Sequence, residues 1–136
     1  MNIDKVTMLK FRENGDGRGK LVVIEGIKDI SFEIKRLFYI YGSDASAVRG
    51  RHANRHTEFV LINVRGSSKV MVKDASAEKV FVLDKPHMGV YLPKMAWKEM
   101  YDFSPDSVLL CLASTVYDPA EYIRDYEQFL KEDNNE

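Results

Sequence analysis

Short apolar runs separated by turn-forming residues follow one another along most of the chain. The turns are rich in Gly, Asp and Ser, as in NGDGRG (14–19), GSDASAVRG (42–50) and RGS (65–67). The apolar runs are KVTMLKF, KLVVIEG, SFEIKRLFYIY, FVLINV, SKVMVKD, KVFVLDKP, GVYLPK, WKEMYDF and SVLLCLAS. Short strands with such turns, and no alternation of strands with helices, predict an antiparallel sandwich or barrel. The unbroken run FVLINV (59–64) indicates a strand covered on both faces.

The C-terminal segment has a different pattern, typical of an amphipathic helix. In DPAEYIRDYEQFLKED (118–133), Asp118 can act as an N-cap, and a proline stands at the first helical position. Aromatic and aliphatic side chains then recur at helical spacing, which predicts one helix over about 119–131. With no internal repeat or linker, residues 1–136 are predicted to form a single domain.

Composition and charge narrow the class of protein. The 136 residues contain 20 Lys and Arg against 21 Asp and Glu, interspersed, so no basic face for nucleic acid is expected. No apolar stretch reaches the roughly 20 residues that span a bilayer, and the first residues lack the apolar centre of a signal peptide. The lone Cys111 lies within VLLCLA and is predicted to be a buried thiol. We therefore expect a cytoplasmic protein that binds neither nucleic acid nor a membrane.

The segment RGRHANRH (49–56) concentrates chemistry-bearing residues just before the run FVLINV. Side chains alternate along a strand, so His52, Asn54 and His56 are expected on one face and the intervening residues on the other. The histidine spacing, with Glu58 and then a glycine downstream, resembles the first motif of cupins, whose metal ligands converge on the mouth of a β-barrel.

The second cupin motif argues against a metal. It resembles LPKMAW (92–97), in which Trp97 stands where metal-binding cupins have a histidine. Asn54 is a poor ligand for transition metals, and His52 with Glu58 cannot complete a site that usually needs three protein ligands. We predict no metal and no other cofactor.

Several longer segments together resemble one family of cupins, the nucleotide-sugar 3,4-ketoisomerases. These enzymes act on dTDP-4-keto-6-deoxyglucose in the synthesis of 3-amino-3,6-dideoxyhexoses. The similarity runs from about residue 15 to about residue 130, and WKEMYDFS and YIRDY are its most specific parts. The segments that carry it are IKRLFYIY, VRGRHANR, FVLINVRGSSKVMVKD, GVYLPKMAWKEMYDFSPDSVLLCLAS and YDPAEYIRDYEQF.

The resemblance implies a cupin-type jelly roll that forms a homodimer, often with exchanged N-terminal strands, and binds a dTDP-linked 4-keto-6-deoxyhexose without a metal. The glycine-rich NGDGRG after KVTMLKF suits such an exchange. The expected reaction moves the ketone from C4 to C3 of the hexose. A base removes the acidic C3 hydrogen, an enediolate forms, and a proton returns to C4.

The family motif R-G-x-H-A-H is matched here except at its last position, which is Asn54. A second departure is Phe59, where the common pattern has glutamine. Three readings remain open: His52 is the proton carrier, His56 replaces the missing histidine, or the protein binds the sugar without isomerising it. We favour His52, with Asn54 donating a hydrogen bond to the enediolate oxygen. Tyr39 is the counterpart of the family's active-site tyrosine and is expected to relay a proton or to hold a sugar oxygen.

The same resemblance suggests residues that bind the substrate. Arg18, Arg36 and Arg49 are expected to bind the diphosphate, for which guanidinium groups are well suited. Trp97 is predicted either to contact the sugar or to pack in the barrel wall. Lys98 stands where relatives carry histidine or arginine, and together with Arg18 it flanks C4. Arg18 resembles the branch with a galacto product and Lys98 matches neither branch, so the C4 configuration stays open.

Two alternatives to the isomerase remain. One is a catalytically silent dTDP-sugar binding module, which the departures at Asn54 and Phe59 would explain. The other is a 3,5-epimerase-like cupin that acts on the same keto sugar at C5.

Overall fold

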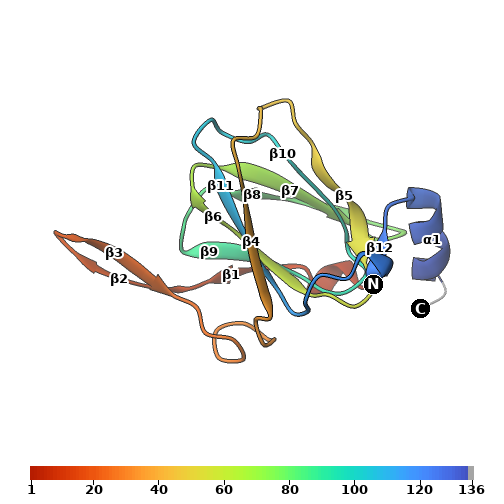
Figure 1. Ribbon diagram of the computed structural model, residues 1–136, viewed down its shortest axis with the longest axis horizontal. Helices are drawn as coiled ribbons and strands as arrows, with labels where there is room; N and C mark the ends of the chain where they lie inside the picture. Colours follow the sequence, from red (N-terminus) through yellow and green to blue (C-terminus); the bar gives the residue numbers. More distant parts are fainter. Residues whose placement is uncertain (135–136) are drawn as a thin grey trace.

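The computed structural model describes residues 1–134, and two five-stranded antiparallel sheets form its body (Figure 1). The first sheet has the order β1 (Thr7–Lys10), β9 (Met88–Leu92), β6 (Phe59–Arg65), β11 (Val108–Ala113) and β4 (Arg36–Tyr41). The second has the order β12 (Tyr122–Ile123), β5 (Arg49–Asn54), β10 (Trp97–Tyr101), β7 (Ser68–Lys73) and β8 (Glu78–Leu83). The predicted all-β, cupin-type jelly roll is confirmed.

Strand β6 is buried on both faces from Phe59 to Asn63, as its largely apolar sequence predicts, whereas Val64 and Arg65 are exposed. Phe59 and Leu61 belong to the core between the sheets, whereas Val60 and Ile62 belong to a second cluster with Phe32. Residues 24–35 supply part of that second cluster and cover the outer face of the sheet. The apolar part of β6 is stable here because neither of its faces is exposed to water.

A two-stranded hairpin projects from this body, to the left in Figure 1 and away from β5. It consists of β2 (Arg12–Asp16) and β3 (Gly19–Val23), and every residue of β2 is exposed. Strand β1, which precedes it, pairs with β9 of the same chain over four residue pairs from Thr7–Tyr91 to Lys10–Met88. The base of the hairpin is held to the body of its own chain, where Arg12 donates to Asp29 and Val22 packs on the second cluster, whereas its turn is exposed.

The predicted helix over 119–131 is wrong in its first half. Asp118 caps only a single 3-10 turn, η2 (Pro119–Glu121), and the chain then pairs with β5 as β12 before α1 (Tyr126–Asn134) begins. Glu121 explains the break, because its buried carboxylate accepts hydrogen bonds from Asn54, Thr57 and the His56 amide. Three such bonds to one carboxylate outweigh the local preference of this segment for helix.

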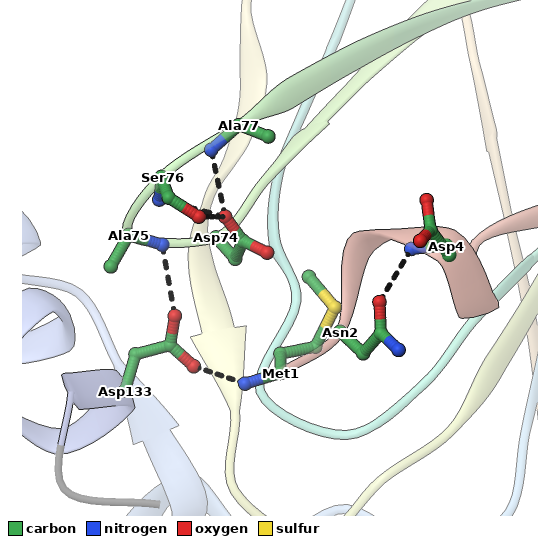
Figure 2. Close-up of polar contacts among 8 residues, drawn as sticks. All are labelled: Met1, Asn2, Asp4, Asp74, Ala75, Ser76, Ala77 and Asp133. Atoms are coloured by element: carbon green, nitrogen blue, oxygen red, sulfur yellow. Dashed lines mark hydrogen bonds and ion pairs between the residues drawn. The ribbon is translucent and has the colours of Figure 1, made fainter.

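Helix α1 is fixed against the barrel by polar contacts at its C-terminal end. Asp133 accepts hydrogen bonds from the amine of Met1 and from the backbone N–H of Ala75, in the turn between β7 and β8 (Figure 2). Glu132 forms a bidentate ion pair with Arg55, with N–O distances of 2.8 and 2.9 Å.

A short 3-10 turn, η1 (Ile3–Lys5), follows Met1. None of the helices formed by residues 1–134 has the length and hydropathy to cross a membrane.

A bulge in β5 brings its side chains close to β10. Gly50 has φ 87° and Arg51 has φ 55°, and the register of β5 against β10 shifts between Lys98 and Glu99. A Cβ on Gly50 would lie 3.0 Å from the Lys98 carbonyl oxygen and 3.1 Å from the Met100 sulfur. The bulge therefore needs glycine for its backbone conformation and also for the close approach of β10.

Alanine substitutions can separate these two requirements. Gly42 also has a positive φ, of 70°, but a Cβ there would meet nothing within 4 Å. We expect Gly42→Ala to lower the free energy of unfolding by about 1 kcal/mol, the cost of left-handed backbone. Gly50→Ala should lower it by about 2–4 kcal/mol, because steric crowding adds to that cost. Urea denaturation measures the free energy of unfolding of both variants. Equal losses would show that β10 can shift to accept the added methyl group at no cost in stability.

Candidate functional site

A cavity of about 130 Å³ opens between the two sheets, at the side where β4 and β5 lie. Its walls are mostly apolar, and four side chains supply its charged or polar groups. The apolar side chains are Phe38, Ile40, Phe59, Leu61, Met100 and Cys111. The charged or polar ones are Arg49, His52, Lys98 and Tyr122. A concave apolar site with a few converging polar groups is the usual form of a small-molecule site.

His52 contributes a neutral imidazole to this cavity. Its Nδ1 lies 3.0 Å from the carbonyl oxygen of Gly50, and a carbonyl only accepts, so Nδ1 carries the hydrogen and Nε2 keeps a free lone pair. Burial, and then the charge of Lys98, lower the pKa of His52 to about 3. The ring also packs on Tyr122, with centroids 4.9 Å apart. His52 is therefore held in a fixed orientation as a proton acceptor.

Lys98 enters the same cavity from β10 and is held by Asn54. Its Nζ donates to Asn54 Oδ1 at 2.9 Å, and Asn54 Nδ2 donates to Glu121 Oε1 at 2.6 Å. The carboxylate requires the NH₂ side of the amide, which fixes the amide oxygen toward Lys98. His52 and Asn54 thus share one face of β5, as the strand alternation predicts, and Asn54 contacts the cavity through Lys98.

Burial changes the proton affinity of two groups in this network. It lowers the pKa of Lys98 to about 7, although the nearby Glu121 carboxylate opposes the change. Burial alone would raise the pKa of Glu121, but hydrogen bonds from Thr57, Asn54 and the His56 amide outweigh it and keep that pKa below its ordinary value. Glu121 is therefore a fixed negative charge behind Asn54, whereas Lys98 can change its charge near neutral pH.

Two arginines near the cavity have unused hydrogen-bonding capacity. Arg49 lines the cavity and is exposed, with no carboxylate partner within residues 1–134. Arg36 donates through Nη1 to the Tyr122 hydroxyl at 3.3 Å, but its buried Nε and Nη2 have no partner in the described part of the chain. Unpaired guanidinium groups beside a cavity are suited to an anionic ligand.

Five of the nine predicted site residues are thus brought together: Arg36, Arg49, His52, Asn54 and Lys98. Tyr39 is the clearest exception. It is 58% exposed and lies on the outer face of β4, whereas its neighbours Phe38 and Ile40 line the cavity. Because side chains alternate along a strand, Tyr39 does not reach the cavity of its own chain. The tyrosine that does reach it is Tyr122.

The other three predicted residues also lie outside the cavity. Trp97 is buried under α1, with ring centroids 5.0 Å from Tyr126 and 5.6 Å from Phe129, and so packs in the barrel wall. His56 lies beyond the end of β5 and is exposed. The side chain of Arg18 is 91% exposed at the tip of the hairpin, where it pairs with Asp16 at 2.7 Å.

Two residues of the site were missed by sequence reasoning, Tyr122 and Glu121. Both were assigned to the predicted helix because of its regular aromatic spacing. A strand of two residues has no periodic pattern of its own, so its sequence carries no signal for β12. The acidic residue that was considered, Glu58, lies elsewhere: its carboxylate accepts a hydrogen bond of 2.5 Å from Tyr91 and does not line the cavity of His52.

Within residues 1–134 no group of three or more His, Cys, Asp and Glu side chains is arranged to hold a metal ion. Cys111, the only cysteine, is buried as predicted, and burial raises the pKa of its thiol to about 12. The cavity can offer a neutral imidazole, a buried amine and the guanidinium group of Arg49 to a ligand. These groups suit proton transfer on a molecule that carries an anionic part.

Comparison with known proteins agrees with this chemistry. The family described as WxcM-like, C-terminal (FdtA) matches residues 4–134. A TDP-4-oxo-6-deoxy-alpha-D-glucose-3,4-oxoisomerase from Aneurinibacillus thermoaerophilus is 41% identical over 124 residues, which is 91% of this chain and 89% of the relative.

Solved structures are similar over almost the whole chain. A mutant of the 3,4-ketoisomerase QdtA from Thermoanaerobacterium thermosaccharolyticum, in complex with TDP-4-keto-6-deoxyglucose, is 39% identical with a TM-score of 0.94 and covers 96% of this chain and 95% of its own. The TDP-fucose-3,4-ketoisomerase WlaRA from Campylobacter jejuni is 41% identical with a TM-score of 0.89 and covers 96% of each chain. The chain therefore belongs to the WxcM-like, C-terminal (FdtA) family of cupin-fold proteins, as its sequence motifs predicted.

Proposed function

We propose that this protein is a TDP-sugar 3,4-ketoisomerase, which converts TDP-4-keto-6-deoxyglucose to a TDP-3-keto-6-deoxyhexose. The observation that carries the proposal is that His52 and Lys98 line the same, largely apolar cavity. Both have pKa values lowered by burial, so each can exist without a charge near neutral pH. The Aneurinibacillus relative and the QdtA complex support the choice of substrate, since both are named with this sugar nucleotide and this reaction.

The chemistry requires only proton transfers. The C4 carbonyl acidifies the hydrogen on C3, and removal of that hydrogen gives an enediolate shared by the two carbons. Return of a proton to C4 leaves the ketone at C3. His52 takes part as a neutral proton acceptor, and the dry walls around it keep bulk water from competing for the enediolate.

The arginines suit the diphosphate of the substrate. The cavity of about 130 Å³ is smaller than the roughly 300–1,000 Å³ typical of sites for whole ligands. The sugar therefore occupies the cavity, and the nucleotide lies outside it. Arg49, which lines the cavity and is exposed, is then available to the phosphate oxygens. The two free nitrogens of Arg36 are buried, so Arg36 binds phosphate only if its side chain moves.

The working unit proposed here is a homodimer that exchanges the hairpin β2–β3. Arg18 lies in the turn between β2 and β3 and does not line the cavity of its own chain. The hairpin projects away from β5 (Figure 1), so Arg18 binds substrate only if it reaches the cavity of a second copy. The outer face of β4 supplies an apolar contact surface, with Leu37 54%, Tyr39 58% and Tyr41 71% exposed. Within one chain β1 pairs with β9, so we propose the hairpin as the part of the N-terminal strands that is exchanged.

A cytoplasmic location is part of the proposal. The unpaired, buried Cys111 is consistent with a reducing compartment. The chemistry also fits, because nucleoside diphosphate sugars are made from nucleotides of the cytoplasm.

The function is tested by incubating the protein with TDP-4-keto-6-deoxyglucose and trapping the product with an aminotransferase and an amino donor. The wild-type protein should give a 3-amino sugar. His52→Asn should lower turnover by about 10²–10⁴-fold, the scale of a positioned acid–base group, and should still fold and bind TDP. Full activity in this variant would exclude His52 from the reaction.

Other results would select the alternatives. TDP binding without any product from the wild-type protein would indicate a sugar-nucleotide binding module. Solvent deuterium at C5 of the sugar would indicate epimerase chemistry.

The diphosphate role is tested at Arg49, with Arg51 as a matched control. Arg51 is two residues away in the same bulge, but its guanidinium points to Glu99 at 3.6 Å. Arg49→Ala should weaken TDP binding by about tenfold or more, as expected when a charged hydrogen bond is lost. Arg51→Ala should leave binding within about twofold. Isothermal titration calorimetry with TDP distinguishes them, and equal affinities would remove Arg49 from the site.

Exchange of the hairpin is tested by mixing two inactive variants. Arg18→Ala keeps its own His52, and His52→Asn keeps its own Arg18. If Arg18 serves the cavity of the other copy, a mixed dimer has one complete site, and co-refolding the two variants should restore up to about a quarter of the wild-type activity. Elution of the wild-type protein at monomer mass, or no recovery from a mixture shown to contain mixed dimers, would contradict the exchange.

A further inference from the structure

Lys98 is an unusual side chain for the wall of an apolar cavity. It is 3% exposed, and its ammonium lies 4.6 Å from the centre of the Phe59 ring. No carboxylate within residues 1–134 forms a direct ion pair with it, and the nearest fixed negative charge, Glu121, lies behind Asn54. A buried amine without a direct counter-ion is costly to fold, so its presence is better explained by use than by stability.

Asn54 can hold this amine in either protonation state. Its Oδ1 accepts a hydrogen bond from Lys98, and both an ammonium and a neutral amine have N–H groups to donate. The amide cannot take up a proton itself, and it adds no charge beside the amine. Lys98 can therefore release and regain a proton without losing its position, which a proton-transfer group needs.

We infer that Lys98 carries the carbon-bound hydrogen of the sugar from C3 to C4, and that His52 carries the hydroxyl proton from O3 to O4. The inference rests on the proposed ketoisomerase function and deepens it. It assigns the C3 proton to Lys98 in place of His52, which sequence reasoning favoured. Asn54 becomes a positioning residue for Lys98, where the sequence suggested a donor to the enediolate.

The steps balance without any further reactant. The neutral amine of Lys98 takes the C3 hydrogen as a proton, the C–H electron pair forms the C3=C4 bond, and the carbonyl pair moves to O4. His52 Nε2 takes the proton from O3 and delivers it to O4. The O3 electron pair then forms the C3 carbonyl, and the C3=C4 pair takes a proton at C4 from the Lys98 ammonium. Both residues end in their starting states.

A single amine serves one face of the planar enediolate, which fixes the configuration at C4. In the gluco ring the hydrogens on C3 and C4 point to opposite faces. Delivery to C4 from the face that lost the C3 hydrogen inverts that relation and gives the galacto configuration, with an axial C4 hydroxyl. The configuration left open by the sequence follows from the position of Lys98.

The electrostatic surroundings support this role. The groups that act on Lys98 are Glu121 from η2, Cys111 from β11, Arg36 from β4 and His52 from β5. Burial lowers the pKa of Lys98 to about 7, so a substantial fraction of the amine is neutral at physiological pH. Burial lowers the pKa of His52 to about 3, which makes it a weak base toward a C–H bond. The acid limb of kcat/KM should therefore follow Lys98, with activity rising as pH increases through about 7.

The test compares Lys98→Met and His52→Asn in D₂O with TDP-4-keto-6-deoxyglucose, following deuterium at C3 of the substrate by NMR. His52→Asn should lose product but keep exchange at C3, because the amine still removes that hydrogen. Lys98→Met should lose exchange and product by about 10²–10⁴-fold. It should keep its fold and its TDP affinity, since Met fills a similar volume without a charge.

Lys73→Met is the matched control, because the Lys73 amine lies over Tyr126 at 4.2 Å and does not line the cavity. It should keep wild-type rates.

Two results in a working enzyme would overturn the inference: exchange at C3 at the wild-type rate in Lys98→Met, or a wild-type product with an equatorial C4 hydroxyl. A wild-type protein that binds TDP but gives neither exchange nor product would instead overturn the proposed function, and the inference with it. The two failures are therefore distinguishable.

Discussion

The buried carboxylate of Glu121 is the contact on which the rest of the site depends. It accepts hydrogen bonds from Asn54, Thr57 and the backbone N–H of His56, and so joins η2 to the end of β5. This attachment prevents the C-terminal segment from continuing as a helix and places Tyr122 against His52. It also fixes which way the Asn54 amide points, and the amide in turn holds Lys98. One charge outside the cavity thus determines the geometry of several groups that line it.

The cavity shows how burial can lower the proton affinity of two neighbouring bases. A neutral imidazole and an amine that titrates near neutrality share a small apolar space, and the same desolvation produces both states. Because the ordinary pKa of histidine lies below that of lysine, the same burial leaves His52 the weaker base and Lys98 the stronger one. Separation of proton affinities between neighbouring groups is a general way to divide acid–base work in an enzyme.

The sequence was informative where its pattern reflects burial, and uninformative where a single long-range contact decides the structure. The both-face burial of β6, the buried Cys111 and the shared face of His52 and Asn54 follow from local alternation and were predicted correctly. The false helix over 119–125 arose because aromatic spacing is regular there, whereas Glu121 is held by residues more than sixty positions earlier. Tyr39 lies away from the cavity of its own chain for a similar reason: a resemblance gives the neighbourhood of a residue, but the strand register gives its face. The roles of Lys98 and Asn54 depend on a hydrogen bond between two strands, which spacing along one strand does not reveal.

Because the hairpin β2–β3 projects from the barrel, the barrel and the complete catalytic unit differ in stability. A two-stranded ribbon exposed on its own is only marginally stable in water, whereas the barrel has a continuous apolar core. If Arg18 completes the neighbouring copy's site, its correct placement depends on association, and dilution or mild heating dislodges it first. Catalytic competence would then fade across a range of conditions in which spectroscopy still reports an intact β-barrel.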